Sequence, residues 1–303
     1  MVHDKLLKKS MKKNLYVLYW LFKTRAYWWN SPKYNILSFQ DTVNEIIKNK
    51  KSISRFGDAE FNFIIKDNGT AFQKTDDELS ERLCEVLNSE LPNLLVAIPE
   101  SLNSVRNLKN DSKDYWLRFI FHREKRVSNT IKNKSKIFGD AFISRFYQDY
   151  INKKEVPQKV KLLQNIWENK NILIVEGEFS RLGIGNDLFS NSQSIERIIC
   201  PAKRAFEKYD EILNITKEHG KNKLIIIALG PSATILAYDL AKENYWALDL
   251  GHIDIEYSWF LEKAKSKIPV RGKKSAEVFG QESFDLTAEE EQIYTQSICA
   301  KIG

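Results

Sequence analysis

The sequence predicts an α/β protein whose core is a Rossmann-like parallel sheet with crossover helices. Short apolar runs in the carboxyl-terminal half alternate with amphipathic stretches, and three of the runs end in a tight turn that contains glycine. The runs are Ile172–Val175, Ile198–Ile199, Leu224–Leu229 and Ala247–Leu250. This alternation is typical of parallel strands joined by helices, and ligands bind at the carboxyl ends of such strands. We therefore expect the polar turns to meet in one crevice that suits a phosphorylated ligand.

The amino-terminal half shows the same alternation of helix and strand signals. A helix is expected over Asp41–Lys51, with Asp41 as its N-cap, and the strand Ser52–Phe56 follows it. A capping box that begins at Thr75 predicts the next helix. Three further elements are expected: a strand over Leu94–Ile98, a helix over Lys113–Arg126 and a strand over Ile137–Gly139.

The expected domain organisation is an amino-terminal helical extension, residues 1–35, and one domain, residues 36–303. That domain is built from two α/β halves, residues 36–155 and 160–285, and a last helix over Ala288–Ala300 that Thr287 caps. The charged stretch Lys153–Lys161 separates the halves, and a helix over Val160–Trp167 opens the second one. We expect the two halves to share one cleft.

The composition indicates a folded globular protein that meets anions. Hydrophobic residues make up 43% of the 303 residues and charged residues 29%, which disfavours extensive disorder. The formal net charge of +7 suits contact with nucleotide phosphates, nucleic acid or an acidic membrane, without choosing among them. Cys84, Cys200 and Cys299 are far apart and show no CxxC spacing. Free thiols in a reducing, cytoplasmic compartment are expected, rather than disulfides or a zinc site.

The amino-terminal segment combines basic and aromatic residues. The apolar run Leu15–Phe22 is too short to cross a bilayer, which takes about 20 residues. Lysines precede it and Lys23 and Arg25 follow it, so the segment could lie on an anionic membrane at the inner face of the cell. The alternative is a helix that packs its aromatic side chains on the body of the protein. These are Tyr16, Tyr19, Trp20, Phe22, Tyr27, Trp28 and Trp29.

Two carboxylates directly follow the first predicted strand. Asp58 and Glu60 are separated by one residue, and a turn at Gly57 would project both to one side. Mg²⁺ typically takes one or two protein carboxylates together with phosphate oxygens and water. The spacing therefore predicts a metal held against a diphosphate, with Arg55 as a further cation for the same anion. The alternative is a solvated acidic turn with a surface ion pair.

Two glycine-containing turns are candidates for phosphate binding. Gly183 and Gly185 allow close approach of a ligand, a helix expected to begin near Asn186 would offer free N–H groups, and Arg181 could neutralise a phosphate. The third glycine of a dinucleotide fingerprint is missing, and the turn is not a Walker A loop. An ordinary strand-to-helix turn is the alternative.

The second turn is similar. Gly230 ends a strand, and Ser232 could cap the helix that follows and points its N-terminus at the crevice. A cap alone is the simpler interpretation.

His252 and Glu256 are candidates for proton transfer. They follow the last predicted strand at i, i+4 spacing and could share a proton or a substrate hydroxyl, with Asp254 between them. A structural histidine near a helix start is the alternative. The other histidines have no such acidic neighbours.

Taken in this order, the motifs resemble the GT-D fold glycosyltransferases, a bacterial family first described as a domain of unknown function. The resemblance covers residues 40 to 280 approximately. It is carried by Arg55–Glu60, Ser144–Tyr147, Glu176–Phe189, Ala228–Thr234 and Asp249–Tyr257. Ala59 stands between the two acids where the family often has glycine, a position that supplies no ligand.

The resemblance implies a metal-dependent transferase that moves a hexose, with glucose expected, from a UDP-sugar to a glycan. The glycan would belong to a bacterial glycoprotein or surface polysaccharide. Asp58 and Glu60 would hold Mn²⁺ or Mg²⁺, Arg55 would assist the leaving diphosphate, and Glu256 or His252 would act as the base. The residues expected to bind the donor are Arg145, Arg181, Gly183, Gly185, Gly230 and Ser232.

Two other classes of function stay open. A non-catalytic nucleotide- or phosphosugar-binding module would need the same glycine turns but no base. A nucleic-acid binder would account for the positive charge, but the basic residues are dispersed and no binding signature is present, so nucleic acid is not an expected partner.

Overall fold

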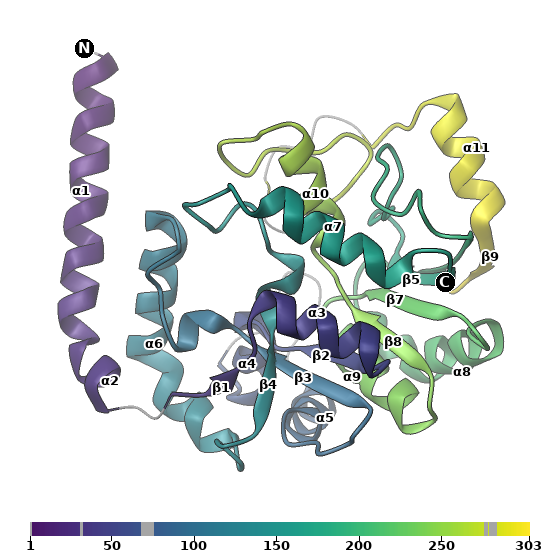
Figure 1. Ribbon diagram of the computed structural model, residues 1–303, viewed down its shortest axis with the longest axis horizontal. Coiled ribbons are helices and arrows are strands. Elements are labelled where there is room, and N and C mark those ends of the chain that lie inside the picture. Colours follow the sequence, from purple (N-terminus) through teal and green to yellow (C-terminus); the bar gives the residue numbers. More distant parts are fainter. Residues whose placement is uncertain (1, 31–32, 68–75, 276–277, 279–283) are drawn as a thin grey trace.

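The computed structural model describes residues 2–30, 33–67, 76–275, 278 and 284–303. Within these residues nine strands form one sheet, in the order β1-β4-β3-β2-β8-β7-β5-β6-β9 (Figure 1). Each pair of neighbouring strands is parallel, which confirms the predicted α/β class. The strands are β1 (Asn35–Ile36), β2 (Ser52–Arg55), β3 (Leu94–Ile98), β4 (Ile137–Asp140), β5 (Asn171–Gly177), β6 (Ser194–Cys200), β7 (Leu224–Ala228), β8 (Trp246–Asp249) and β9 (Ile298–Lys301).

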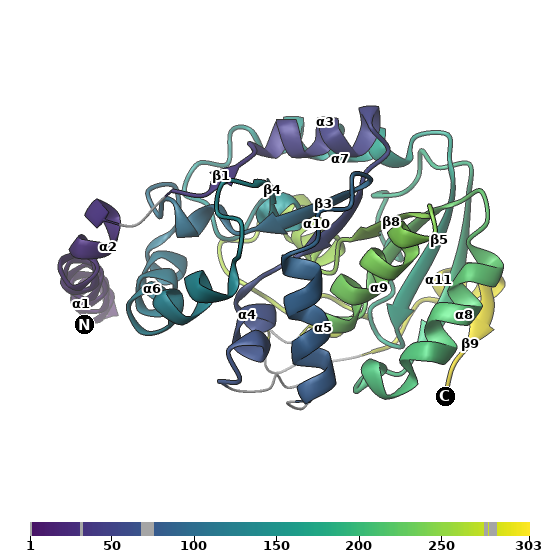
Figure 2. The same ribbon diagram turned by 90° about the horizontal axis from the view of Figure 1, so that it is seen from below.

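Helices connect the strands and cover both faces of the sheet. The α-helices are α1 (Val2–Lys23), α2 (Arg25–Asn30), α3 (Phe39–Lys48), α4 (Asp58–Ile64), α5 (Asp77–Leu87), α6 (Asn110–Thr130), α7 (Val156–Trp167), α8 (Tyr209–His219), α9 (Pro231–Lys242), α10 (Ile253–Leu261) and α11 (Ala288–Ser297). Short 3₁₀ helices are η1 (Glu100–Leu102), η2 (Ala141–Ser144) and η3 (Ala205–Lys208). Helices α3, α7 and α10 pack on one face, and α4, α5, α6, α8 and α9 pack on the other (Figure 2).

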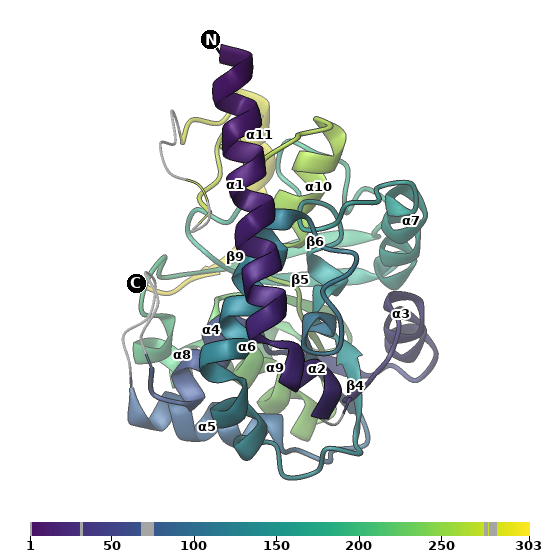
Figure 3. The same ribbon diagram turned by 90° about the vertical axis from the view of Figure 1, so that its left-hand side faces the viewer.

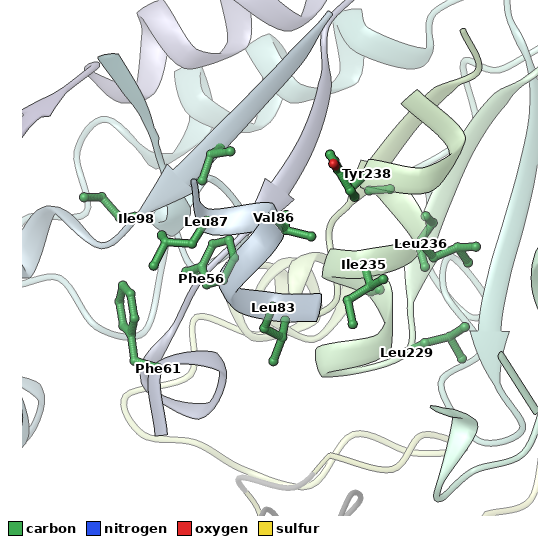
Figure 4. Packing of buried hydrophobic residues seen from close by; sticks show 14 of the residues in the cluster. Phe56, Phe61, Leu83, Val86, Leu87, Ile98, Leu229, Ile235, Leu236 and Tyr238 are labelled. Carbon is green, nitrogen blue, oxygen red and sulfur yellow. The ribbon is translucent and has the colours of Figure 1, made fainter. Parts of the chain in front are cut away.

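Strands β3 and β7 are apolar throughout, and β5 is apolar over residues 172–175, because both of their faces are covered. In β5, Leu173 and Val175 join the core on the α8–α9 side, whereas Ile172 and Ile174 join the core on the α7 side. Successive side chains of a strand point to opposite faces, so a strand buried on both sides needs a continuous apolar run. Figure 4 shows part of the core on the α8–α9 side of the sheet, where Leu83 of α5 lies near α9.

The two halves of the chain meet where β2 pairs with β8, in register at Ile53 and Leu248. One sheet therefore runs through both halves. The division at residues 155 and 160 stays a prediction. The charged stretch expected between the halves is partly helical, since α7 begins at Val156 with Pro157 in its first turn, where a missing N–H costs nothing.

Some element boundaries differ from the prediction. Ser38, not Asp41, caps α3, because its side chain accepts from the Asp41 amide and the helix begins at Phe39. Thr75 lies outside the described residues, and Asp76 caps α5 by accepting from the Leu79 amide.

The predicted last helix, Ala288–Ala300, is wrong at its end. It stops at Ser297, and β9 follows directly. Strand β9 forms the edge of the sheet beside β6, an interaction between distant segments that no local sequence pattern predicts. The Thr287 cap is confirmed, with a capping box completed by Glu290.

The amino-terminal extension is helical, as predicted. Helix α1 stands at the outer edge of the molecule beside α6, and its amino-terminal end projects beyond the body (Figures 1 and 3).

Candidate active site

A cleft of about 1010 Å³ lies along the carboxyl ends of the strands. Residues one or two positions after the ends of seven strands line it, in the place where open parallel sheets bind ligands. They are Gly57, Pro99, Ala141, Phe179, Pro201, Leu229 and Gly251. The turns after β5, β7 and β8 thus contribute to one cleft with the acidic segment after β2.

Asp58 and Glu60 both line this cleft. They occupy the first turn of α4, where negative side chains interact favourably with the helix dipole. The Glu60 carboxylate accepts from the Gly57 amide at 2.8 Å, so it satisfies the backbone N–H of the N-cap residue of its own helix. The sequence predicted an open turn here, whereas the structure places both acids on a helix that begins at Asp58.

The carboxylates at the cleft repel one another. Burial raises the pKa of Glu60 to about 7, and the charges of Asp249 and Asp58 act in the same direction. The Tyr115 hydroxyl of α6 donates to Asp58 Oδ2, and Tyr115 also lines the cleft. Because the ionised form of Glu60 is disfavoured, a cation at this position would relieve the repulsion.

Arg55 joins the ends of three strands. Its guanidinium Nη2 lies 3.0 Å from Asp249 Oδ1 at the end of β8, and its Nε donates to the Asp249 carbonyl at 2.6 Å. A third donor reaches the Ala141 carbonyl after β4 at 3.3 Å. Thr234 of α9 donates to the other Asp249 oxygen at 3.2 Å. Arg55 lines the cleft, but its guanidinium donates these hydrogen bonds to other residues of the protein. Its main role is therefore to position Asp249 and the ends of the strands.

Arg145 and His252 meet across the cleft, as the sequence alone could not show. Arg145 Nη2 lies 3.1 Å from His252 Nε2, and Arg145 Nη1 lies 3.8 Å from Asp149 Oδ2. All three line the cleft. His252 occupies the N-cap position of α10, and its side chain makes no capping hydrogen bond to that helix.

Glu256 does not line the cleft, and its predicted partnership with His252 is wrong. It is fully buried, and its Oε2 accepts from the Tyr147 and Gln148 amides at 2.7 and 2.8 Å. Burial raises its pKa to about 7, with Asp149 acting in the same direction. The i, i+4 spacing is real, but α10 turns Glu256 toward the segment that carries Arg145.

The turn after β5 also departs from the prediction. The described structure has no helix at Asn186; residues 178–193 form consecutive turns. Arg181 does not line the cleft, because its Nη1 donates to the Gly272 and Phe284 carbonyls at 2.8 and 2.6 Å. It ties this turn to the segment before α11.

Gly183 and Gly185 serve the turn itself. Both have positive φ, at 75° and 74°. The Gly183 amide donates to Asp254 at 2.7 Å, and a Cβ on Gly185 would lie 2.8 Å from Glu290 Oε1. Neither glycine lines the cleft. Gly177, Phe179 and Ser180, from the same motif, do line it.

Two buried ion pairs hold this turn in place, and the sequence did not predict either. Glu176 and Arg197 pair at 2.7 Å, and Asp254 and Lys273 pair at 2.5 Å. Glu176 also accepts from the Leu182 amide at 2.7 Å. For the first pair, the available signal was a charged residue within each of the strands β5 and β6, two register positions apart.

Gly230 lines the cleft at the start of α9, with a positive φ of 56° and no atom within 4 Å of where a Cβ would stand. Ser232 does not cap the helix. Its side chain is buried and has no hydrogen-bond partner among the described residues, and Gly230 is the N-cap.

Basic side chains surround the cleft, and the sequence analysis did not single them out. They are Lys109, Lys203, Arg204, Lys265, Lys267 and Lys274. They come from four separate segments, so only the fold collects them at one opening for an anionic ligand.

A different group could bind a metal elsewhere. Among the described residues, Glu196, His219 and Cys299 bring three ligand atoms within 4.8 Å of one another. None of them lines the cleft. Lys223 already pairs with Glu196 at 2.7 Å, and the Cys299 thiol donates to the Arg197 carbonyl at 3.2 Å, so both ligands are engaged.

The model of one family, glycosyltransferase GT-D fold, matches residues 53–278, most of the chain. The chain belongs to this family. The matched region contains the acidic segment after β2 and the turns after β5, β7 and β8.

Two curated proteins are similar to this GT-D chain. A probable glycosyl transferase Gly of Streptococcus gordonii is 35% identical over 273 residues, which are 89% of this chain and 39% of that protein. Glycosyltransferase GlyD of Streptococcus pneumoniae serotype 4 is 32% identical over 270 residues, 88% of this chain and 32% of that protein. The chain thus spans well under half the length of either relative.

Solved structures share the GT-D fold over nearly their whole length. The structure described as the highly conserved domain of unknown function 1792 with a distinct glycosyltransferase fold has a TM-score of 0.84 and 32% identity, covering 94% of this chain and 100% of that one. A glycosyltransferase of the same domain type from Streptococcus sanguinis has a TM-score of 0.80 and 34% identity, covering 89% of this chain and 100% of that one.

Proposed function

We propose that the protein is a metal-dependent glycosyltransferase that moves a hexose, glucose in the first instance, from a UDP-sugar to a glycan acceptor. One observation carries the proposal. The acidic pair of α4 and the turns after β5 and β7 line the same cleft, at the carboxyl ends of parallel strands. Family membership supports the reaction class, and the metal, donor and acceptor are our inference.

The acidic pair fits a hard divalent cation. Asp58 and Glu60 offer carboxylate oxygens to the cleft, the ligand type that Mn²⁺ and Mg²⁺ prefer. Burial raises the pKa of Glu60 to about 7, and the charges of Asp249 and Asp58 add to this effect, so a cation there would be favourable. When bound, the cation would neutralise the charge that develops on the departing diphosphate.

The chain's own groups would bind and orient the donor. Gly230 leaves open space at the start of α9, so a phosphate could approach the backbone closely there. Lys203, Arg204 and Lys274 line the same part of the cleft as the turns after β5 and β6 and would add positive charge. Arg55 would act indirectly, since it holds Asp249 and the strand ends in place.

We assign the base to His252. It lines the cleft, whereas Glu256 is buried and held by two backbone amides. As the base, His252 would accept the proton of an acceptor hydroxyl at Nε2, in place of the contact that Arg145 Nη2 makes there at 3.1 Å. Glu256 would be a positioning residue that fixes the segment after Arg145.

The acceptor is proposed to be a glycan on a bacterial glycoprotein or surface polysaccharide, and the location cytoplasmic. The free Cys84, Cys200 and Cys299 are consistent with a reducing compartment.

Release of free nucleotide from a panel of nucleotide sugars, with and without Mn²⁺, tests the reaction. We expect UDP-glucose with Mn²⁺ to give the highest rate, and Asp58→Asn and Glu60→Gln to lower it by at least about 100-fold. Glutamine keeps an acceptor oxygen for the Gly57 amide, so this hydrogen bond can survive. Asp114→Asn, an acid in a surface pair with Arg118, is the matched control and should leave turnover unchanged.

The same panel separates an enzyme from a non-catalytic binding module. His252→Ala should keep UDP-induced stabilisation while it loses at least about 100-fold in turnover. Stabilisation by UDP with no nucleotide release from any donor would instead favour the binding module. Equal rates with and without a divalent cation would refute the metal assignment.

A further inference from the structure

Helix α1 presents an apolar stripe to solvent. Leu15, Leu18, Tyr19 and Phe22 are exposed by 63%, 61%, 50% and 60%, and their spacing puts them on one helical face. Trp29 of α2 is 89% exposed. Large apolar side chains gathered in this way usually mark an interaction surface.

The opposite face of α1 is firmly docked. Val17 and Thr24 are buried, and the Trp20 ring lies 5.4 Å from the Phe121 ring of α6. The Tyr27 hydroxyl of α2 donates to the Leu102 carbonyl at 2.5 Å. Packing on α6 therefore fixes which face of α1 points outward (Figure 3).

Basic residues accompany the exposed stripe. Lys13, Lys23 and Arg25 are exposed. The sequence of α1 also contains Lys5, Lys8, Lys9 and Lys12 against the single acid Asp4. Tyrosine and tryptophan favour the boundary between lipid headgroups and acyl chains, and lysine and arginine are attracted to anionic lipids.

We propose that α1 and α2 bind the surface of an anionic bilayer, with the stripe at the headgroup boundary. Within the described part of the chain, no helix combines the length and hydrophobicity needed to cross a bilayer, so the contact is peripheral. A second copy fits this surface less well. A two-fold dimer through the stripe would bring Lys23 and Arg25 of both copies close to the same interface, where like charges repel.

Membrane binding would place the cleft at the lipid surface. Asn110 Nδ2 donates to Asn14 Oδ1 at 2.7 Å, and Lys13 pairs with Asp111. Asp111 and Tyr115 of α6 line the cleft, so α1 adjoins one rim of it. This arrangement favours an acceptor glycan that is presented at the membrane, an inference that rests on the proposed transfer reaction.

Co-sedimentation with vesicles tests the membrane contact without any sugar donor, so its outcome is independent of the transfer assay. The wild-type chain should bind phosphatidylglycerol-containing vesicles, bind pure phosphatidylcholine weakly, and lose binding as salt is raised. Leu15→Glu with Leu18→Glu should lower the partition coefficient by about tenfold or more.

The matched control also replaces two exposed aliphatic side chains by glutamate, but at positions outside α1. Ile151 and Ile293 are exposed by 60% and 54%, and Ile151→Glu with Ile293→Glu should bind as the wild type does. Thermal unfolding verifies that both variants are folded. Wild-type affinity in the α1 variant would overturn the proposal. A wild-type dimer in solution that the α1 variant dissociates, with no vesicle binding, would also overturn it and assign the stripe to a second copy.

Discussion

The Tyr115 hydroxyl donates to Asp58, so helix α6 orients a carboxylate that belongs to the first turn of α4. Because Tyr115 itself lines the cleft, its ring also forms part of the wall beside the acidic pair. The contact joins residues 57 positions apart and identifies Tyr115 as a positioning residue for the proposed metal site.

Tyr115→Phe keeps the ring and removes only the donor. Partners that orient metal-binding carboxylates typically contribute ten- to hundredfold to metal affinity. We therefore expect Mn²⁺ affinity, measured by calorimetry in the presence of UDP, to fall by about tenfold with unchanged thermal stability. Phe121→Tyr at an exposed position of α6 is the control. Equal Mn²⁺ affinity in Tyr115→Phe and wild type would show that Asp58 needs no such orientation.

Glu256→Gln should stabilise the protein above neutral pH. The pKa of Glu256 is raised from 4.5 to about 7, so the folded state binds more protons than the unfolded state between these values. The wild type therefore loses stability as pH rises from 4.5 to 7, by an amount on the order of 1–3 kcal/mol, and the variant avoids this loss. Glutamine can still accept from both amides through its one oxygen.

Urea unfolding of both proteins between pH 4 and pH 8 measures this difference, which should be small at pH 4 and level off above pH 7. The same variant tests the assignment of the base. Turnover of Glu256→Gln within about threefold of wild type would agree with a positioning role. A loss near 100-fold would indicate that Glu256, not His252, is the base.

Arg197→Ala should strongly destabilise the turn after β5. The side chains of Arg197 and Glu176 are exposed by only 2% and 0%, so removal of the arginine leaves a buried carboxylate without its partner. Loss of one member of such a pair costs about 3–5 kcal/mol. Adding Glu176→Gln to Arg197→Ala should restore part of the free energy of unfolding, measured by chemical denaturation. If the double variant is less stable than Arg197→Ala by the full cost of a second mutation, the pair is not coupled.

Arg181→Met separates a structural role from phosphate binding. Its guanidinium donates to two carbonyls and does not line the cleft. We expect the variant to lose about 1–3 kcal/mol of stability and to bind UDP within about twofold of wild type. Lys274→Met, at a cleft residue, should weaken UDP binding instead. A tenfold loss of UDP affinity in Arg181→Met alone would instead show that Arg181 binds a phosphate, as the sequence predicted.

Several features follow from local pattern and could be predicted. Strands β3 and β7 and residues 172–175 of β5 are continuous apolar runs, and a parallel sheet covered on both faces requires such runs. The acidic pair and Gly230 follow strands directly, so their arrival at one edge of the sheet needs only the strand direction. The helical extension and the Thr287 capping box are also properties of contiguous residues.

The structural roles of Arg181 and Glu256 could not be predicted from local sequence patterns. Their positions in the chain are compatible with a phosphate ligand and a base, but the partners that occupy them, such as Phe284 and Gln148, are 103 and 108 residues away. Strand β9 was missed for the same reason, since its pairing with β6 is a contact between distant segments.

The sequence by itself determined the α/β class, the edge of the sheet where a ligand would lie, and the acidic and glycine residues available there, because each depends on short-range periodicity. Only the tertiary structure decided which side chains reach that edge. Arg181 and Glu256 do not line the cleft, because hydrogen bonds to backbone groups far away in the sequence hold them elsewhere. Packing of α6, in contrast, places Tyr115 next to Asp58. The same packing turned the apolar stripe of α1 outward, because a helix of this composition can bury only the face that meets its neighbour.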